Sequence, residues 1–180
     1  MIDFDKRDLV LSVINNNPLR EGKISDEDFI EKYTRLNKAI SQKIKEELED
    51  SLLKKNAFTL ELTLYVGFHF SFSIDDEEIL VLILNGSWHQ KHDEVLRALV
   101  KIKACSNSAV DSIYYCAINN FDYLEDDKDD GIYTLSSNCI YALAKIGTEY
   151  AVEKLYLLSK NGQQEISKKA KEVMEYYNLN

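Results

Sequence analysis

Residues 60–74 read LELTLYVGFHFSFSI, and the secondary structure of this stretch decides the fold class. Every second residue from Leu60 to Ile74 is apolar, and this alternation is typical of a β-strand. A strand of this length would be unusual, however, and no other run of the chain alternates in the same way to pair with it. Its backbone N–H and C=O groups would then lack partners. On a helix the same residues cover most of the circumference, so a buried central helix is predicted instead.

Upstream of this stretch, the sequence predicts one long amphipathic helix. Ser25 and Asp28 resemble a capping box, and acidic residues occupy the first turn, where the helix dipole favours them. Apolar residues then recur at three- and four-residue spacing, namely Phe29, Tyr33, Leu36, Ile40, Ile44, Leu48 and Leu52. This pattern predicts a helix of about 30 residues, or roughly 45 Å. A shorter helix is expected over residues 7–14, ending at the sequence NNNP.

Downstream of the same stretch, helix-capping and turn residues recur at regular intervals. Asp75, Ser108 and Thr148 are each placed to cap the start of a helix, and another is expected to begin at His92 or Asp93. Helix ends are predicted at Gly86, Asn119, Asn120, Gly147, Asn161 and Gly162. The face of the first of these helices is predicted to consist of Ile79, Leu82 and Ile83. The pattern predicts six helices in three antiparallel pairs, over residues 75–103, 107–146 and 148–177.

Helix pairs that recur at intervals of roughly 30 to 40 residues are typical of an α-solenoid. The chain holds 1 Pro and 6 Gly in 180 residues, and this scarcity of turn formers favours long helices over a sheet. We therefore predict an all-α fold, an α-solenoid of about three antiparallel helix pairs with an N-terminal helical extension. A single domain is expected over residues 1–180, with N-terminal helices over 1–57 and helical repeats over 58–180.

The net charge of −9 limits the classes of partner that the chain can bind. A general nucleic-acid-binding protein needs a basic stripe to displace counterions, so direct nucleic-acid binding is not expected. No apolar run approaches the length of a membrane span, so no contact with a membrane is expected either. An acidic chain suits a protein partner with a basic surface.

The cysteines and the N-terminal sequence predict a cytoplasmic protein. Cys105, Cys116 and Cys139 show no CxxC spacing, and the charged start MIDFDKRD shows no secretory signal. In a reducing cytoplasm these thiols are expected to be small buried hydrophobic groups. The sequence shows no Ser-His-Asp or Cys-His spacing and no glycine-rich phosphate loop, so neither enzyme activity nor a cofactor is predicted.

Residues 85–94 read NGSWHQKHDE and hold two of the chain's 3 histidines beside its single Trp. His89 and His92 could form a metal site with His69, although the spacing is not HExxH. Alternatively, they could cap backbone carbonyls or the next helix start at a helix junction, with Trp88 packed between helices. A third interpretation places both histidines on the concave surface with Trp88 as an interface anchor.

Residues 121–133 read FDYLEDDKDDGIY and form the most acidic segment of the chain. Its five carboxylates belong to Glu125, Asp126, Asp127, Asp129 and Asp130, with Lys128 as the only compensating charge. The segment could be a solvated loop, since charge runs usually are. It could also cap a basic cleft of a partner, flanked by Tyr123 and Tyr133 as interface aromatics. A calcium loop is a third interpretation, although neither the spacing nor the glycine position is that of an EF-hand.

Three segments resemble a family of small bacterial HEAT-repeat proteins. They are WHQKHDEVLRAL, FDYLEDD and CIYALAKIGTEYAVEKLYLLS, and the resemblance extends over residues 60–177. The positions that match the family pattern directly are Trp88, His89, His92, Tyr123, Cys139, Ala142, Leu143, Gly147 and Thr148. The chain departs from the pattern in the reversed acid order of Asp93 and Glu94, in Asn138 where Lys is usual, and in Tyr141 where a second Trp is usual.

The resemblance implies a HEAT-like fold and a function as an immunity protein, because members of this family are associated with contact-dependent and polymorphic toxin systems. It implies a cognate toxin as the partner, and the acidic charge suggests a toxin with a basic active site, such as a nuclease. The predicted partner-binding residues are Trp88, His89, His92, Glu94, Tyr123, Glu125, Asp126, Asp127, Asp129, Asp130 and Tyr133. The alternatives are a HEAT scaffold that joins two host proteins, and a histidine-based metalloprotein or enzyme.

Overall fold

The computed structural model describes residues 6–14, 22–127 and 131–179, and in these ranges all regular secondary structure is helical, without a β-strand. The all-α prediction is confirmed. The α-helices are α1 (Lys6–Ile14), α2 (Asp26–Leu36), α3 (Ile40–Lys54), α4 (Ala57–Phe70), α5 (Glu77–Leu84), α6 (His92–Lys101), α7 (Asn107–Ile118), α8 (Gly131–Ile146), α9 (Glu149–Ser159) and α10 (Gln164–Tyr176). Two 3₁₀ segments are η1 (Ile74–Asp76) and η2 (Asp122–Asp127).

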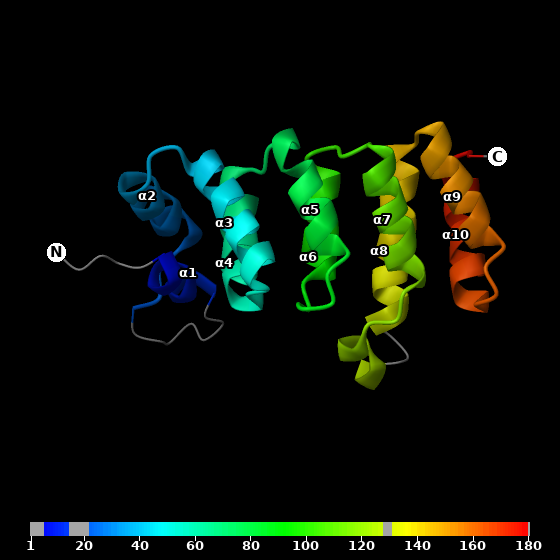
Figure 1. Ribbon diagram of the computed structural model, residues 1–180, viewed down its shortest axis with the longest axis horizontal. Helices are drawn as coiled ribbons and strands as arrows, with labels where there is room; N and C mark the ends of the chain where they lie inside the picture. Colours follow the sequence, from blue (N-terminus) through cyan, green and yellow to red (C-terminus); the bar gives the residue numbers. More distant parts are fainter. Residues whose placement is uncertain (1–5, 15–21, 128–130, 180) are drawn as a thin grey trace.

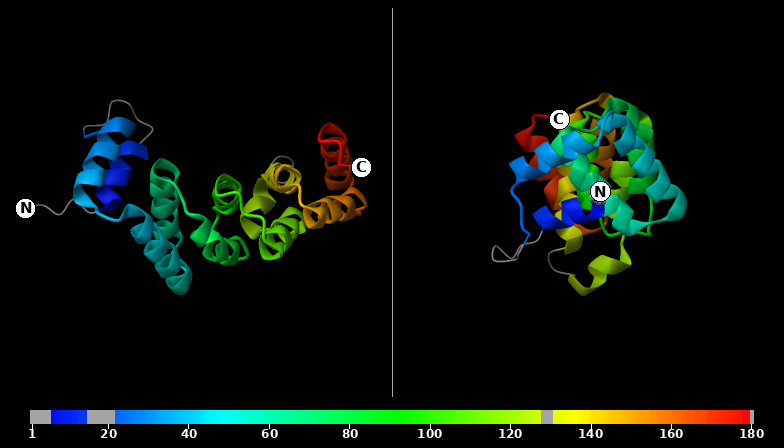
Figure 2. Two further views of the ribbon diagram at one scale, coloured as in Figure 1. Left: turned by 90° about the horizontal axis from the view of Figure 1, so that it is seen from above. Right: turned by 90° about the vertical axis from the view of Figure 1, so that its left-hand side faces the viewer.

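The helices pack as consecutive pairs that stand side by side in one row, with the chain termini at opposite ends (Figure 1). The first helices of the last four pairs, α3, α5, α7 and α9, contact one another in order and form one layer. Their partners α4, α6, α8 and α10 form a second layer. Figure 2 shows that the row curves and that the second layer lies on the inner side of the curve. The buried apolar side chains form one cluster that runs from α1 to α10.

Helix α4 lies where the sequence pattern alternates like a strand. The helix prediction is confirmed as far as Phe70, and residues on several sides of α4 are buried, among them Leu60, Leu62, Leu64 and Val66. The alternation continues past the helix end for a separate reason. The Phe72 ring folds back onto Gly67, where an added Cβ would lie 2.2 Å from the ring. Ile74 is 53% exposed, so the last apolar position of the pattern is not part of the core.

The prediction of one helix from Phe29 to Leu52 is wrong, because the chain breaks it into α2 and α3. At the break, both the backbone N–H and the side-chain amide of Asn37 donate to the Tyr33 carbonyl at 3.0 Å, and Ala39 adopts a left-handed φ of 56°. The break preserves the apolar spacing, which is why the sequence pattern does not show it. It lets the α2 side chains pack on α4 while α3 packs on both α4 and α5.

The helix starts confirm two of the predicted caps and correct two others. Ser25 accepts from the Asp28 N–H at 3.1 Å, and Thr148 accepts from the Ala151 N–H at 3.2 Å. Helix α7 is capped by Ser106, which accepts from the Ala109 N–H, and not by Ser108. Ser73 and Asp76 form a capping box at η1, so the predicted cap at Asp75 is also wrong. In both errors a neighbouring polar residue has the extended backbone that a cap requires.

The structure tests three further predictions, each of which concerns a single residue. Leu82 was expected to face the core but is 49% exposed, because the short helix α5 buries Leu80, Val81, Ile83 and Leu84 instead. Cys105 was also expected in the core and is exposed, since it follows the end of α6 in a connecting segment. Gly147 ends α8 with a φ of 64°, as predicted. The NNNP sequence after α1 lies outside the described residues.

Two further features concern where the paired layers begin and how long and apolar the helices are. Helix α3 packs against α4 across the boundary that the sequence suggested near residue 57, so the paired layers begin at α3. Among the described helices, none combines the length and the apolar character needed to cross a membrane.

Candidate functional site

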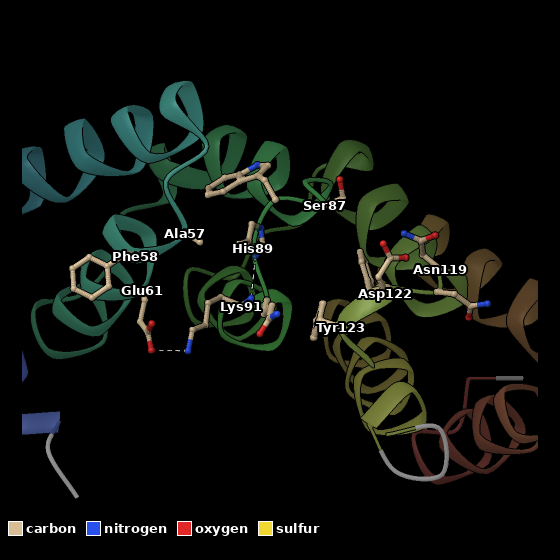
Figure 3. A pocket seen from close by; sticks show the side chains of 13 residues that line it. Ala57, Phe58, Glu61, Ser87, His89, Lys91, Asn119, Asp122 and Tyr123 are labelled. Carbon is tan, nitrogen blue, oxygen red and sulfur yellow. Dashed lines mark hydrogen bonds and ion pairs between the residues drawn. The ribbon is translucent and has the colours of Figure 1, made fainter. Parts of the chain in front are cut away.

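A hollow of about 670 Å³ lies beside the turn between α5 and α6, at one edge of the row of helix pairs (Figure 1). Three segments line it: the start of α4, the turn between α5 and α6, and the segment that follows α7 (Figure 3). The lining residues are Ala57, Phe58, Glu61, Ser87, Trp88, His89, Gln90, Lys91, Asn119, Asn120, Phe121, Asp122 and Tyr123. We call this hollow the edge pocket. It brings together segments that are more than one helix apart in the sequence.

His89 stabilises the turn between α5 and α6 from the interior of the protein. Its ring is 3% exposed, and Nδ1 accepts a hydrogen bond from the Lys91 backbone N–H at 3.0 Å. Nε2 must therefore carry the proton, and it donates to the Ile83 carbonyl at 2.8 Å. The ring thus joins a carbonyl near the end of α5, where unpaired carbonyls need hydrogen-bond donors, to Lys91, the residue that precedes α6.

His92, the first residue of α6, forms the second internal support. It is 0% exposed, and its Nε2 donates to the Gly86 carbonyl at 3.0 Å. The Tyr123 hydroxyl donates to Nδ1 at 3.0 Å, which ties the turn to the segment that follows α7. The ring also stacks on His89 with centroids 4.5 Å apart and contacts Phe121 at 3.8 Å. Two neighbouring helix pairs are therefore joined through one imidazole.

Burial keeps both imidazoles neutral. It lowers the pKa of His89, and it lowers the pKa of His92 to about 4, with the proximity of His89 as a second cause. Burial also raises the pKa of Tyr123, so its hydroxyl stays protonated and can donate to His92. In this arrangement all four ring nitrogens have hydrogen-bond partners. The interpretation of the two histidines as caps of a helix junction is confirmed.

Trp88 packs over this buried pair and is itself half-buried. Its ring meets the His89 ring edge-on, with centroids 4.7 Å apart. Gly86 permits this position, because a Cβ at residue 86 would lie 2.4 Å from the Trp88 indole nitrogen. The rigid histidine pair therefore fixes the orientation of a large amphipathic ring that remains partly accessible.

The rim of the edge pocket is acidic. The Lys91 ammonium lies 2.7 Å from Glu61 and 3.5 Å from Glu94, and a second cation, the Arg7 guanidinium, lies 5.1 Å from the centre of the Phe58 ring. These contacts with Glu61 and Glu94 raise the pKa of Lys91 against the effect of burial. On the opposite side, Asp122 is exposed at the start of η2. The sequence continues from there into the five carboxylates of residues 125–130.

The structure brings together some of the predicted site residues and separates others. Trp88, His89 and Tyr123 line the edge pocket, and His92 and Glu94 lie directly behind its wall. Tyr133 is 41% exposed but lines a different hollow, between α8 and α10. The backbone of η2 reaches Asp127, whereas the side chains of Glu125, Asp126 and Asp127 and all of Asp129 and Asp130 lie outside the described residues.

His69 does not join the other two histidines. Its ring packs against Phe29 of α2, its Nδ1 lies 3.0 Å from the Tyr65 carbonyl, and its Nε2 lies 3.5 Å from Asp26. Across the described ranges, no three His, Cys, Asp or Glu side chains are grouped so that they could hold a metal ion. The alternative of a three-histidine metal site therefore has no geometric support.

Several residues of the edge pocket were not predicted from the sequence. Phe58 and Glu61 come from α4, and no local pattern connects them with residues 85–94. Lys91 lies inside the NGSWHQKHDE stretch, but its role depends on Glu61, which is 30 residues away in the sequence. Asn119, Asn120 and Asp122 could have been found, since they directly precede the acidic run that the sequence already marks.

In comparisons with known proteins, the chain matches no family model, no curated protein and no solved structure. The resemblance to HEAT-repeat proteins therefore stays a prediction that depends on the quoted motifs alone.

Proposed function

We propose that this is a non-enzymatic binding protein of the immunity type, which docks through the edge pocket onto a cognate toxin and blocks its active site. We also propose that its row of helix pairs is a HEAT-like α-solenoid that serves as a rigid platform for this contact. The observation that carries the proposal is that an accessible aromatic wall, formed by Trp88 and Tyr123, lies against the buried, neutral pair His89 and His92.

The aromatic wall supports a role in protein binding. Trp88 and Tyr123 line the pocket, and on its far side Phe58 is 42% exposed, with the Arg7 guanidinium 5.1 Å from the centre of its ring. Aromatic anchors that are held in one orientation lose little conformational entropy on binding, and Trp and Tyr are enriched among the residues that dominate interface energies. His89 and His92 are too deeply buried to offer much contact surface themselves. Their proposed role is to fix the wall.

The charge around the pocket supports a partner with a basic surface. Glu61 and Asp122 line the pocket, Glu94 lies behind its wall beside Lys91, and the acidic run of residues 125–130 follows Asp122 closely in the sequence. Enzymes that cleave nucleic acid bind a polyanion and need cations at the active site. An acidic ligand can occupy such a site, and long-range attraction accelerates its association. A toxin of the nuclease class therefore fits best.

The first experiment is co-expression with the product of the adjacent upstream reading frame. We expect the two chains to co-purify in a fixed ratio and the toxic activity to be suppressed. A neighbouring frame that encodes no toxin, or a toxin that stays active beside this chain, would contradict the proposal.

Two variants then locate the contact on the edge pocket. Trp88→Ala is expected to weaken binding at least about tenfold through faster dissociation, because it removes a central anchor. Replacing Asp126, Asp127, Asp129 and Asp130 with Asn is expected to slow association about tenfold and to reduce its salt dependence. Tyr176→Ala is the control, because Tyr176 is 78% exposed at the end of α10 and does not line the pocket. An equal loss in the control would rule out the edge pocket as the contact.

A further inference from the structure

A second groove is lined by residues of α4, α6 and α8. These helices lie on the inner side of the curved row (Figure 2). The groove has a volume of about 650 Å³ and shares no lining residue with the edge pocket. Its apolar floor includes Leu96 and Ala142, which are 2% and 3% exposed, and the half-buried Val100. With Phe68 of α4, the apolar lining of the groove comes from three successive helix pairs; we call these apolar residues the strip.

Cations from α6 and α8 border this strip, although the chain as a whole carries a charge of −9. The Arg97 guanidinium lies 5.0 Å from the centre of the Phe68 ring. The Lys101 ammonium lies 5.6 Å from the same ring and donates to the Phe68 carbonyl at 2.8 Å. Lys145 of α8 adds a third, exposed cation. Phe68 thus holds two positive charges beside the floor.

The positive border continues toward α10. The Lys169 ammonium lies 4.8 Å from the centre of the Tyr141 ring, and Tyr141 itself lines the groove. Asp93 is the one carboxylate in the lining of the groove, and it accepts a hydrogen bond from the Asn138 amide at 2.7 Å. Glu165 lies with Lys169 in the next hollow along the row. Within the groove itself, three cations face one carboxylate that already has a partner.

We propose that this inner groove binds an acidic amphipathic helix of a partner protein. An apolar floor between cations matches a helix that carries apolar residues on one face and carboxylates on its flanks. Arg can pair with a carboxylate through two hydrogen bonds, which would fix the register of the helix along the groove. A nucleic acid fits less well, because the net charge of −9 repels a polyanion at long range.

This proposal goes beyond the proposed function and does not depend on it. The edge pocket presents carboxylates to a basic surface, whereas the inner groove presents cations to an acidic one. Two surfaces of opposite charge allow one partner to be held at two places or two partners to be joined. The groove can be tested without any toxin.

The test uses a fluorescent synthetic peptide of about 15 residues, roughly four helical turns, with Leu at helical spacing and Glu on both flanks. We expect the full chain to bind it, with changes in the NMR signals of Arg97, Asn138 and the residues around them. Arg97→Glu combined with Lys145→Glu should weaken binding at least about tenfold, since two attractions become repulsions. The milder pair Arg97→Gln and Lys145→Gln provides the same test if charge reversal prevents folding.

The control pair is Lys54→Glu and Lys160→Glu, which changes the net charge equally but lies at the ends of α3 and α9 in the other layer. It should leave peptide binding within about twofold of the wild type, because it alters only long-range charge. Equal weakening by both pairs would overturn the proposal. So would the absence of binding up to about 1 mM peptide, equal binding of a matched peptide with Lys in place of Glu, or displacement of the peptide by a single-stranded oligonucleotide at equal concentration.

Discussion

Two of the turns that join paired helices reverse the chain with different contacts. The turn between α9 and α10, residues 160–163, uses short polar contacts. Asn161 accepts from the Gln163 N–H at 2.8 Å, and the Ser167 hydroxyl donates to the Ser159 carbonyl at 2.6 Å. The turn between α5 and α6, residues 85–91, depends on two imidazoles that are 3% and 0% exposed. One turn only reverses the chain, whereas the other is supported by buried rings.

This difference indicates that the α5–α6 turn has a second task besides reversing the chain. Buried polar rings must find a partner for each nitrogen, so they cost desolvation free energy that a simple turn avoids. In return they fix Trp88 and join the turn to Tyr123 of the next helix pair. A turn that only connected α5 to α6 would not need either contact. The following predictions test this comparison, from the largest expected effect to the smallest.

His92→Ala should cause the largest loss of stability. It removes the support of the Gly86 carbonyl and the Tyr123 hydroxyl and leaves a space beside Phe121. We expect the free energy of unfolding to fall by about 3–4 kcal/mol, measured by urea denaturation. Asn161→Ala in the simple turn should cost about 0.5–1 kcal/mol, as the loss of a local cap does. Equal losses of unfolding free energy in the two variants would mean that the buried imidazole does not support its turn more strongly than the polar contacts support the other.

Stability should also fall in mild acid. The folded protein keeps His92 neutral with a pKa of about 4, whereas the unfolded chain takes up a proton near the ordinary value of about 6.5. This contribution is therefore complete above about pH 6.5 and is lost as the pH falls toward about 4, for a total of about 3 kcal/mol. The lowered pKa of His89 acts in the same direction.

Urea denaturation at a series of pH values measures this loss. His92→Gln, which cannot titrate, should show a shallower dependence between about pH 6.5 and 4 than the wild type. An unchanged dependence would show that the buried ring is not the titrating group.

Gly86→Ala should disturb the α5–α6 turn, whereas Gly162→Ala should leave the α9–α10 turn almost unchanged. A methyl group at residue 86 would meet the Trp88 indole at 2.4 Å, but at residue 162 it meets nothing within 4 Å. We expect Gly86→Ala to cost about 2 kcal/mol through overpacking, with a shift in Trp88 fluorescence. Gly162→Ala should stay within about 0.5 kcal/mol of the wild type. An unshifted emission maximum would show that Trp88 is not held against Gly86.

Tyr123→Phe should have the smallest effect of the series. It removes the donor to His92 Nδ1 and leaves that buried acceptor unpaired, which should cost about 1 kcal/mol. Tyr115→Phe is the control, because Tyr115 is 58% exposed on α7. The two unfolding free energies can be compared directly in urea. A loss in Tyr115→Phe as large as that in Tyr123→Phe would mean that the link between the helix pairs adds nothing.

Much of the helical architecture could be predicted from the sequence, because its causes are local. The stop at Gly147 and the caps at Ser25 and Thr148 depend on residues within one turn of the helix end. The break at Ala39 could not be predicted. Residues 37–39 keep Leu36 and Ile40 four residues apart, as on a continuous helix, and Ala has no preference for a left-handed φ. The exposed Leu82 was missed because α5 is too short for its apolar pattern to define one face.

At the candidate site, too, some features could be predicted from the sequence and others could not. The NGSWHQKHDE stretch marks Trp88, His89 and His92 from their type and spacing alone. It cannot say that the imidazoles point inward, because their partners include Ile83 at the end of α5 and Tyr123 after α7. It also cannot connect Glu61 with Lys91, since a contact between residues 30 positions apart depends on how two helix pairs pack.

The sequence by itself therefore determined the all-helical class, most helix limits and the acidic character of the chain. Each of these depends on composition, on residue spacing or on contacts within a helical turn. Only the tertiary structure decided that two histidines are neutral supports, that an aromatic wall faces an acidic rim, and that cations gather on the inner groove of an acidic protein. These properties depend on burial and on side chains from separate helix pairs, and a linear sequence specifies neither directly.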